Sequence, residues 1–142
     1  MNFDHGKYLG VDYGDKRTGL AECDVSGLLA SGIGTISEGG MKNTAERVAK
    51  EATARGCKKI IIGLPKNMDG TEGSRAQLCR EFAQKVEAVT GIQVNMWDER
   101  RTTVEAHNIL SAHNYHGKKR KNTVDAVAAS LILEGYLSFR AR

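Results

Sequence analysis

Four carboxylates stand where strands or helices are expected to end or begin. Asp12 ends one apolar stretch, and Asp98 and Glu99 end another. Asp125 lies in the first turn of the last predicted amphipathic helix. In an open α/β sheet, ligands bind beyond the carboxyl ends of the strands. Acids at strand ends therefore lie where a ligand would bind. Three that faced one another would repel strongly without a cation. Their oxygen ligands suit Mg²⁺ or Mn²⁺, and two such ions roughly 3.5–4 Å apart can promote phosphodiester hydrolysis.

Each acid also has a purely structural interpretation. Asp12 is a residue type that often forms turns at strand ends. Residues 98 and 99 can form surface salt bridges with the two arginines that follow them. Asp125 can stabilise a helix dipole from the first turn. Spacing alone leaves these alternatives open and does not name a function.

The order of predicted elements is that of an α/β sheet. In chain order, we predict strands at 7–12, 20–23 and 28–36, a helix from 43 that stops at Gly56, a strand at 58–64, a helix at 74–91, a strand at 92–97, and helices at 102–111 and 124–137. Short turns between the first three strands predict an antiparallel meander. The two later strands each follow a helix, and such crossovers predict right-handed parallel pairing. The expected fold is therefore a mixed five-stranded sheet flanked by helices.

Local signals support this order of elements. Capping boxes that begin at Asn43 and Ser74 predict two helix starts. Three consecutive isoleucines at 60–62 predict a strand covered on both faces. The polar, basic stretch 113–122 lacks an apolar period and predicts a mobile loop. One face of the second helix is expected to present Cys79, Phe82, Val86 and Val89.

Size and composition favour one soluble domain. The chain has 142 residues, of which 40% are hydrophobic and 27% charged, so we expect a single domain over 1–142. The longest nearly apolar run, 126–133, is too short to cross a bilayer. The N-terminus lacks the basic start and apolar stretch of a secretory signal, which predicts a cytoplasmic protein without a membrane partner.

The cysteines and the charge distribution add two expectations. Cys23, Cys57 and Cys79 lack the spacing of a zinc site or a disulfide framework, and we expect them in the core. The net charge is +4, and a run of four consecutive cations occupies 118–121. Such a run is either a solvated loop or a patch that binds phosphates.

Four segments together resemble the motifs of the YqgF family, RuvC-like proteins described as Holliday-junction resolvases or as pre-16S rRNA nucleases. The segments are GVDYGDKRTG at 10–19, GLPKNMDGTEG at 63–73, WDERRTT at 97–103, and KKRK at 118–121 followed by DAVAASLIL at 125–133. The resemblance runs from about residue 7 to residue 137, nearly the whole chain. One Asp-x-Gly would be a weak signal, whereas four motifs in order are a strong one.

The resemblance implies an RNase H-like fold and metal-dependent cleavage of structured nucleic acid. It assigns the catalytic and metal-holding roles to Asp12, Glu99 and Asp125, with Asp98 as the alternative to Glu99. Neighbours on a strand point to opposite faces, so only one of those two is expected to be a ligand. RuvC resolvases carry a further acid near the last one, but here asparagine and alanine stand three residues before and after Asp125. This difference leaves one or two metal ions as alternatives.

The same motifs supply candidate contacts to a sugar-phosphate backbone, because arginine can grip a phosphate with two hydrogen bonds and lysine attracts it as a point charge. Trp97 could stack on a base, although packing in the core is the better expectation. The candidate nucleic-acid-binding residues are Lys16, Arg17, Asn67, Arg100, Arg101, Lys118, Lys119, Arg120 and Lys121.

The expected function is therefore phosphodiester hydrolysis at the 5′ end of pre-16S rRNA. A resolvase of four-way DNA junctions is one alternative, and a nucleic-acid-binding module with little catalysis is another. The expected partner is pre-rRNA or branched DNA, with Mg²⁺ or Mn²⁺ and no small-molecule cofactor. The chain is expected to be a monomer or a weak homodimer. Since a resolvase cuts two strands symmetrically, that alternative requires a dimer.

Overall fold

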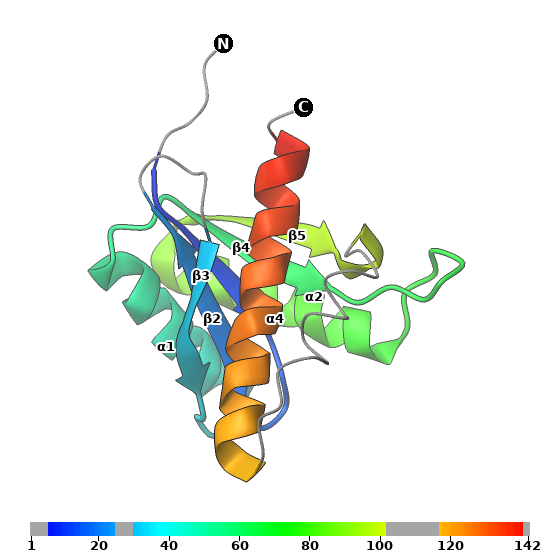
Figure 1. Cartoon of the computed structure of the whole chain (residues 1–142), viewed down its shortest axis with the longest axis horizontal. Coiled ribbons are helices and arrows are strands. Elements are labelled where there is room, and N and C mark those ends of the chain that lie inside the picture. Colours follow the sequence, from blue (N-terminus) through cyan, green and yellow to red (C-terminus); the bar gives the residue numbers. More distant parts are fainter. Residues whose placement is uncertain (1–5, 25–29, 102–116, 141–142) are drawn as a thin grey trace.

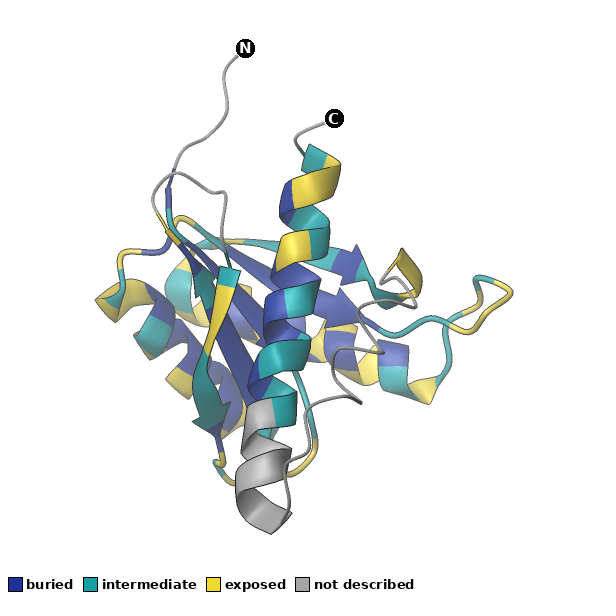
Figure 2. Cartoon of the chain, viewed as in Figure 1, coloured by how far each residue is buried: buried dark blue, intermediate teal, exposed yellow. Residues whose placement is uncertain are grey.

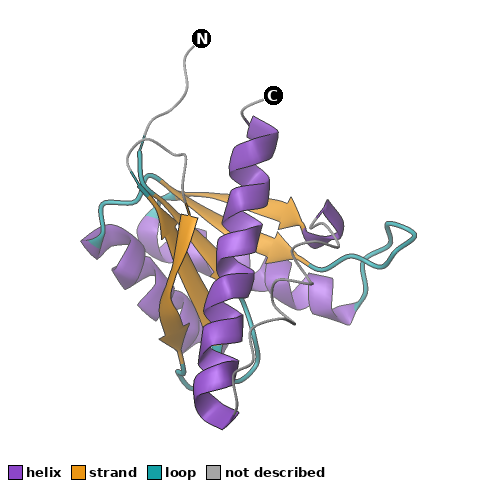
Figure 3. Ribbon diagram, viewed as in Figure 1, coloured by secondary structure: helices purple, strands orange, loops and turns teal. Residues whose placement is uncertain are grey.

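The chain forms one mixed sheet with helices on both faces (Figures 1 and 3). A computed structural model describes residues 6–24, 30–101 and 117–140, with the backbone alone described for 117–123. The strands are β1 (Tyr8–Asp12), β2 (Thr18–Cys23), β3 (Ala30–Ile36), β4 (Lys59–Leu64) and β5 (Gln93–Asp98). The helices are α1 (Gly40–Ala54), α2 (Ser74–Thr90) and α4 (Gly117–Arg140), and a 3₁₀ turn, η1, spans Glu99–Arg101.

The predicted strand pairing is confirmed. The strand order is β3-β2-β1-β4-β5, in which β1 pairs antiparallel with β2 and β2 antiparallel with β3. β1, β4 and β5 run parallel to one another, with Val11 opposite Ile62 and Leu64 opposite Asp98. The carboxyl ends of these three strands therefore lie at one edge of the sheet, where Asp12 and Asp98 are the last strand residues.

Alternating side chains divide the core between the two faces of the sheet. Leu9 and Val11 belong to the cluster that α1 and α2 cover. Tyr8 packs on the other side, in the cluster that contains α4. The isoleucines at 60–62 alternate in the same way, and all three are fully buried. The strand covered on both faces is thus confirmed, and Figure 2 shows these middle strands as the most buried layer.

Glycines on the sheet let α4 approach closely. A Cβ atom added at Gly10 would lie 2.9 Å from the Ala129 carbonyl oxygen, and one at Gly19 would lie 2.0 Å from that of Asp125. Real Cβ atoms essentially never come that near another atom, so both positions require glycine at the present helix position. The absence of two side chains therefore fixes where the first described turns of α4 lie over the sheet.

The start of α1 and the capping of both helices differ from the sequence expectations, whereas α2 begins at residue 74 as predicted. α1 begins at Gly40, and the amide of Asn43 donates to the Gly39 carbonyl (2.8 Å) from inside the first turn. α2 begins at Ser74 itself after the N-cap residue Gly73, without a side-chain cap. Both capping boxes were therefore wrong. Gly40 adopts a φ of 80°, which glycine tolerates, and this lets the chain enter α1 before Asn43.

Two further expectations need correction. The backbone is helical from Gly117, although a loop was expected through residue 122. Lysine and arginine are good helix formers, so the lack of an apolar period does not prevent the helix from extending. Val89 is 53% exposed, because the described core along α2 ends at Val86. The helix expected at 102–111 lies outside the described residues.

The three cysteines confirm their predicted place. Cys23, Cys57 and Cys79 are all buried and free of disulfides. Burial raises the pKa of each thiol, to about 11 for Cys57 and Cys79, which keeps them protonated. Within the described residues, no helix has both the length and the apolar character needed to cross a membrane.

The contact at Gly19 predicts a stability effect. Gly19→Ala should lower the free energy of unfolding by about 2–3 kcal/mol, because the new methyl group must push α4 away from β2. Urea unfolding followed by circular dichroism measures this change. Gly39→Ala is the matched control, since its Cβ would meet nothing within 4 Å and should cost at most about 1 kcal/mol. Equal losses at the two positions would contradict the close approach.

Candidate active site

Asp12 lies at the end of β1 in a strongly unfavourable electrostatic environment. Its pKa is raised from 3.8 to about 7, first by burial and then by the negative charges of Glu99 and Asp125. Arg75 acts in the opposite direction and lowers this pKa. The fold therefore brings the three predicted acids close enough for Asp12 to sense both of the others.

Glu99 reaches the sheet edge immediately after β5, as the first residue of η1. A Cβ atom at Gly63, on the neighbouring strand β4, would lie 3.0 Å from the Glu99 carboxyl carbon and from its Oε2. The glycine thus leaves the space across the end of β4 that the Glu99 side chain occupies. From this position the negative charge of Glu99 contributes, after burial, to the raised pKa of Asp12.

Asp125 comes to the same edge from α4. Its backbone lies directly over Gly19, and its Oδ2 accepts a hydrogen bond from the Arg17 Nε at 2.8 Å. The Arg17 and Asp125 side chains are 31% and 23% exposed. Arg17 belongs to the turn between β1 and β2, so this ion pair connects residues 108 positions apart in the chain.

Asp98 is directed elsewhere. Its carboxylate accepts hydrogen bonds from the Nε and Nη2 of Arg100 at distances of 2.7–3.1 Å. These bonds hold the pKa of Asp98 below its ordinary value. Asp98 is not among the charges that raise the pKa of Asp12. The geometry therefore favours Glu99 over Asp98 as the third member of the acidic cluster.

The chemistry of this cluster fits a hard divalent cation. Its three members offer carboxylate oxygens, and burial followed by the negative charges of Glu99 and Asp125 raises the pKa of Asp12. Across the described residues, however, no group of three or more His, Cys, Asp or Glu side chains is arranged so that it could hold a metal ion. In this structure the Asp125 carboxylate is paired with Arg17.

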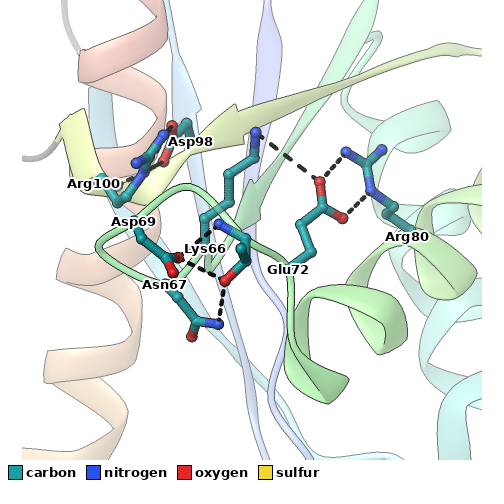
Figure 4. A network of polar contacts seen from close by, with 8 residues as sticks. Lys66, Asn67, Asp69, Glu72, Arg80, Asp98 and Arg100 are labelled. Carbon is teal, nitrogen blue, oxygen red and sulfur yellow. Dashed lines mark hydrogen bonds and ion pairs between the residues drawn. The ribbon is translucent and has the colours of Figure 1, made fainter.

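The loop between β4 and α2 is held by its own polar contacts (Figure 4). Asn67 and Thr71 are joined by a backbone hydrogen bond (2.8 Å) and by an amide-to-hydroxyl bond (2.9 Å). The Asp69 carboxylate accepts from the Thr71 backbone N–H at 2.9 Å. Asn67, a predicted nucleic-acid contact, thus uses its amide group inside the loop.

Two arginines fix this loop to the rest of the molecule. Arg80 on α2 holds Glu72 through two hydrogen bonds of 2.6 and 2.7 Å (Figure 4). Arg100 donates to the Met68 carbonyl at 3.3 Å while it binds Asp98. Met68 itself is 90% exposed, and the loop extends away from the body of the molecule (Figure 1).

The other predicted phosphate contacts differ in how they are engaged. Lys16 is exposed in the turn after β1. The Arg101 guanidinium lies 5.5 Å from the ring centre of Trp97 and 4.6 Å from that of Phe139. Trp97 is 5% exposed, which confirms core packing as the better expectation. The side chains of the cationic run 118–121 lie outside the described residues.

Sequence reasoning missed Arg75, in the first turn of α2. Its Nη1 bonds the Asp15 carboxylate at 2.8 Å, its Nη2 donates to the Tyr13 carbonyl, and its guanidinium lies 5.1 Å from the Tyr13 ring centre. Tyr13 in turn stacks on Phe82 of α2. The available signal was position, since the helix after a parallel strand begins at the same sheet edge as the acids.

The coupling of Asp12 predicts a pH dependence for the metal-free protein. The pKa of Asp12 is higher in the folded protein than in the unfolded chain, so the folded state favours the protonated carboxyl. The stability that Asp12 contributes is therefore complete below about pH 4 and is lost as pH rises through about 7. Asp12→Asn should therefore raise the free energy of unfolding at pH 8 by about 1–3 kcal/mol, with little effect at pH 4. Urea unfolding with a chelator present measures this.

Asp98→Asn provides a control of opposite sign. The pKa of Asp98 is lowered by Arg100, so its stabilisation is present above the ordinary pKa and is lost as pH falls. This variant should be less stable than wild type at pH 8. If Asp12→Asn lowered the stability at pH 8 as Asp98→Asn does, the electrostatic assignment of Asp12 would be wrong.

Comparison with known proteins identifies relatives over nearly the whole chain. A family model described as "RuvX: Holliday junction resolvase" matches residues 6–139. A protein of Carboxydothermus hydrogenoformans named "Putative pre-16S rRNA nuclease" is 40% identical over 136 residues, covering 96% of this chain and 99% of its own. A protein of the same name from Clostridioides difficile is 42% identical, covering 95% and 96%.

Solved structures share the fold at low sequence identity. The Thermus thermophilus RuvC in complex with a Holliday junction substrate has a TM-score of 0.57 at 14% identity, covering 95% of this chain and 96% of that one. The fowlpox virus resolvase in complex with Holliday junction DNA has a TM-score of 0.54 at 16% identity, covering 96% and 99%. These likenesses confirm the expected RNase H-like fold. The family-model match over residues 6–139 and the relatives of 40% and 42% identity place the chain in the RuvX family, the same family as YqgF, as its motifs predicted.

Proposed function

We propose that this protein is a metal-dependent endonuclease that hydrolyses phosphodiester bonds in structured nucleic acid, with the 5′ end of pre-16S rRNA as its substrate. The observation that carries the proposal is the convergence of Asp12, Glu99 and Asp125. They come from β1, from the end of β5 and from α4, and they meet at the edge where α/β sheets bind ligands. The names of the curated relatives support rRNA as the substrate.

Asp12, Glu99 and Asp125 would hold the Mg²⁺ or Mn²⁺ ion. The chemistry that such an ion supplies when bound is activation of water and stabilisation of the leaving oxygen. The Asp125 Oδ2 accepts from the Arg17 Nε at 2.8 Å, so this bond has to break before that oxygen can serve as a ligand. Arg75 holds the turn after β1 through Asp15 and the Tyr13 carbonyl, which steadies the chain beside Asp12.

The substrate would lie over basic and polar groups at the same edge. Lys16 is exposed next to Arg17, and the loop between β4 and α2 presents a backbone fixed by its internal hydrogen bonds. Contacts of this kind position a phosphate chain without reading its sequence. The cationic run 118–121 begins α4, the helix that carries Asp125, and would add long-range attraction for a polyanion.

A four-way DNA junction is the second candidate substrate, favoured by the description of the matching family. The chemistry would be the same, because both substrates are recognised by backbone shape. A symmetric double cut requires a dimer, whereas we propose a monomer or weak homodimer in the cytoplasm. Measuring the mass of the protein–nucleic acid complex in solution distinguishes the two substrates, because only the DNA junction requires two protein chains.

The acidic cluster predicts the loss of cleavage by conservative variants. Asp12→Asn, Glu99→Gln and Asp125→Asn should each lower the rate on precursor rRNA at least a hundredfold in Mn²⁺, because each removes a carboxylate that would hold the ion. Gel assays with precursor rRNA and with a DNA junction, with and without Mn²⁺, measure this. Asp98→Asn should retain cleavage, since Asp98 pairs with Arg100.

Glu87→Gln, an exposed carboxylate on α2, is the control for general loss of charge. Cleavage by all of these variants at the wild-type rate would show that the assigned cluster is not the active site. Nucleic-acid binding without Mn²⁺-dependent cleavage by wild type would support a binding module instead.

The cationic run predicts a change in salt dependence. Lys119→Glu combined with Lys121→Glu should weaken nucleic-acid binding and reduce the slope of log affinity against log salt by about 2, because two phosphate contacts are lost. Fluorescence anisotropy at 50–200 mM salt measures the slope. The matched control is Lys50→Glu with Lys85→Glu, exposed on α1 and α2. An unchanged slope in the first pair would count against the run as a phosphate contact.

A further inference from the structure

The ion pair between Arg17 and Asp125 occupies a carboxylate that the proposed function requires. We propose that Arg17 stands in for a cation, holding Asp125 while no metal ion is bound and leaving it for a substrate phosphate when a divalent ion takes that carboxylate. This inference rests on the proposed function, since it assumes that Asp125 is a metal ligand. It assigns to Arg17 a role in metal loading that a simple phosphate contact would not have.

The fixed partner of this pair is Asp125. Its backbone carbonyl would lie 2.0 Å from a Cβ at Gly19, so α4 packs directly on β2 at this residue. Arg17 instead belongs to the turn before β2, next to the exposed Asp15 and Lys16, and its own side chain is 31% exposed. When the pair separates, the arginine is therefore the side chain with room to move.

Charge explains why the pair forms without a metal ion and why it should separate with one. Asp125 repels Asp12, and the Arg17 guanidinium neutralises part of that negative charge at 2.8 Å from the carboxylate oxygen. A divalent ion on the same carboxylate would supply more positive charge and would repel the guanidinium. A partly exposed ion pair contributes little stability. Breaking the Arg17–Asp125 pair should therefore lower the affinity for the divalent ion only a few-fold.

Arg75 does not compete for the cluster in the same way. Its guanidinium is held by the Asp15 carboxylate and the Tyr13 carbonyl, and it lies over the Tyr13 ring. Arg17 instead forms its ion pair with Asp125, a member of the acidic cluster. The two arginines thus have separate roles: Arg75 positions the turn, and Arg17 exchanges with the ion.

This exchange couples the metal ion to the substrate. A phosphate that binds Arg17 removes it from Asp125 and so favours the ion, and by linkage the ion favours phosphate binding to the same degree. The free protein would then hold its metal ion weakly and retain it better on a nucleic acid.

The first test measures Mn²⁺ affinity without nucleic acid, by the electron paramagnetic resonance signal of free Mn²⁺. Arg17→Ala and Arg17→Gln should both bind Mn²⁺ roughly two- to fivefold more tightly than wild type, because the competitor is gone. Arg47→Ala is the matched control, since it removes an arginine of α1 that pairs with two other carboxylates, Glu38 and Glu51. Unchanged or weaker binding by both Arg17 variants would overturn the proposal.

A double-variant comparison separates this proposal from the proposed function. In an Asp125→Asn background, Arg17→Ala should no longer tighten Mn²⁺ binding, because the shared carboxylate is absent. If Asp12→Asn, Glu99→Gln and Asp125→Asn all bound Mn²⁺ as wild type does, the metal site itself would be refuted. If those variants weakened binding but Arg17→Ala did not strengthen it, only the exchange would be refuted.

The second test measures the release of Arg17 to phosphate. With labelled precursor rRNA and Ca²⁺ at constant ionic strength, the ion should improve binding at least threefold more for wild type than for Arg17→Ala. Fluorescence anisotropy measures both affinities, and the Arg17→Lys variant should recover part of the difference. Equal improvement in wild type and Arg17→Ala would overturn this part of the proposal.

Discussion

The mutual repulsion of carboxylates is the interaction on which the site depends. Asp12 is partly buried near two other acids, and burial together with their negative charges raises its pKa to about 7. A fold keeps such a cluster only if something offsets it, and in this structure Arg17 and Arg75 offset it in part. The same repulsion is what a divalent cation would relieve, which connects the instability of the cluster to its proposed chemistry.

The scaffold holds these acids in place through close packing rather than through polar bonds alone. α4 lies against the sheet at glycines, and the contact of Asp125 with Gly19 fixes the height of one acid over the strand ends. Gly63, where a Cβ would also meet Ile132 of α4, provides the space that Glu99 occupies. Because these positions carry no side chain, a single added methyl group would disturb the site and the core together.

Arginine placement shows how a basic chain can hold an acidic site next to a polyanion. Arg100 is bound to Asp98 and to the loop after β4, Arg101 lies over aromatic rings, and Arg80 holds Glu72. Each therefore supports the surface on which a nucleic acid would lie. Arg17 differs, since its partner is itself a member of the acidic cluster.

The sequence by itself determined the order of strands and helices, the burial of the isoleucines at 60–62 and the family, because these depend on local periodicity and on motifs read in order. It placed acids at strand ends but could not choose between Asp98 and Glu99. Tertiary structure separates the two side chains, since Arg100 binds the Asp98 carboxylate and Gly63 leaves the space that Glu99 occupies. The pairing of Arg17 with Asp125 was equally invisible, because 108 residues separate the two and only the packing of α4 on β2 brings their charges together.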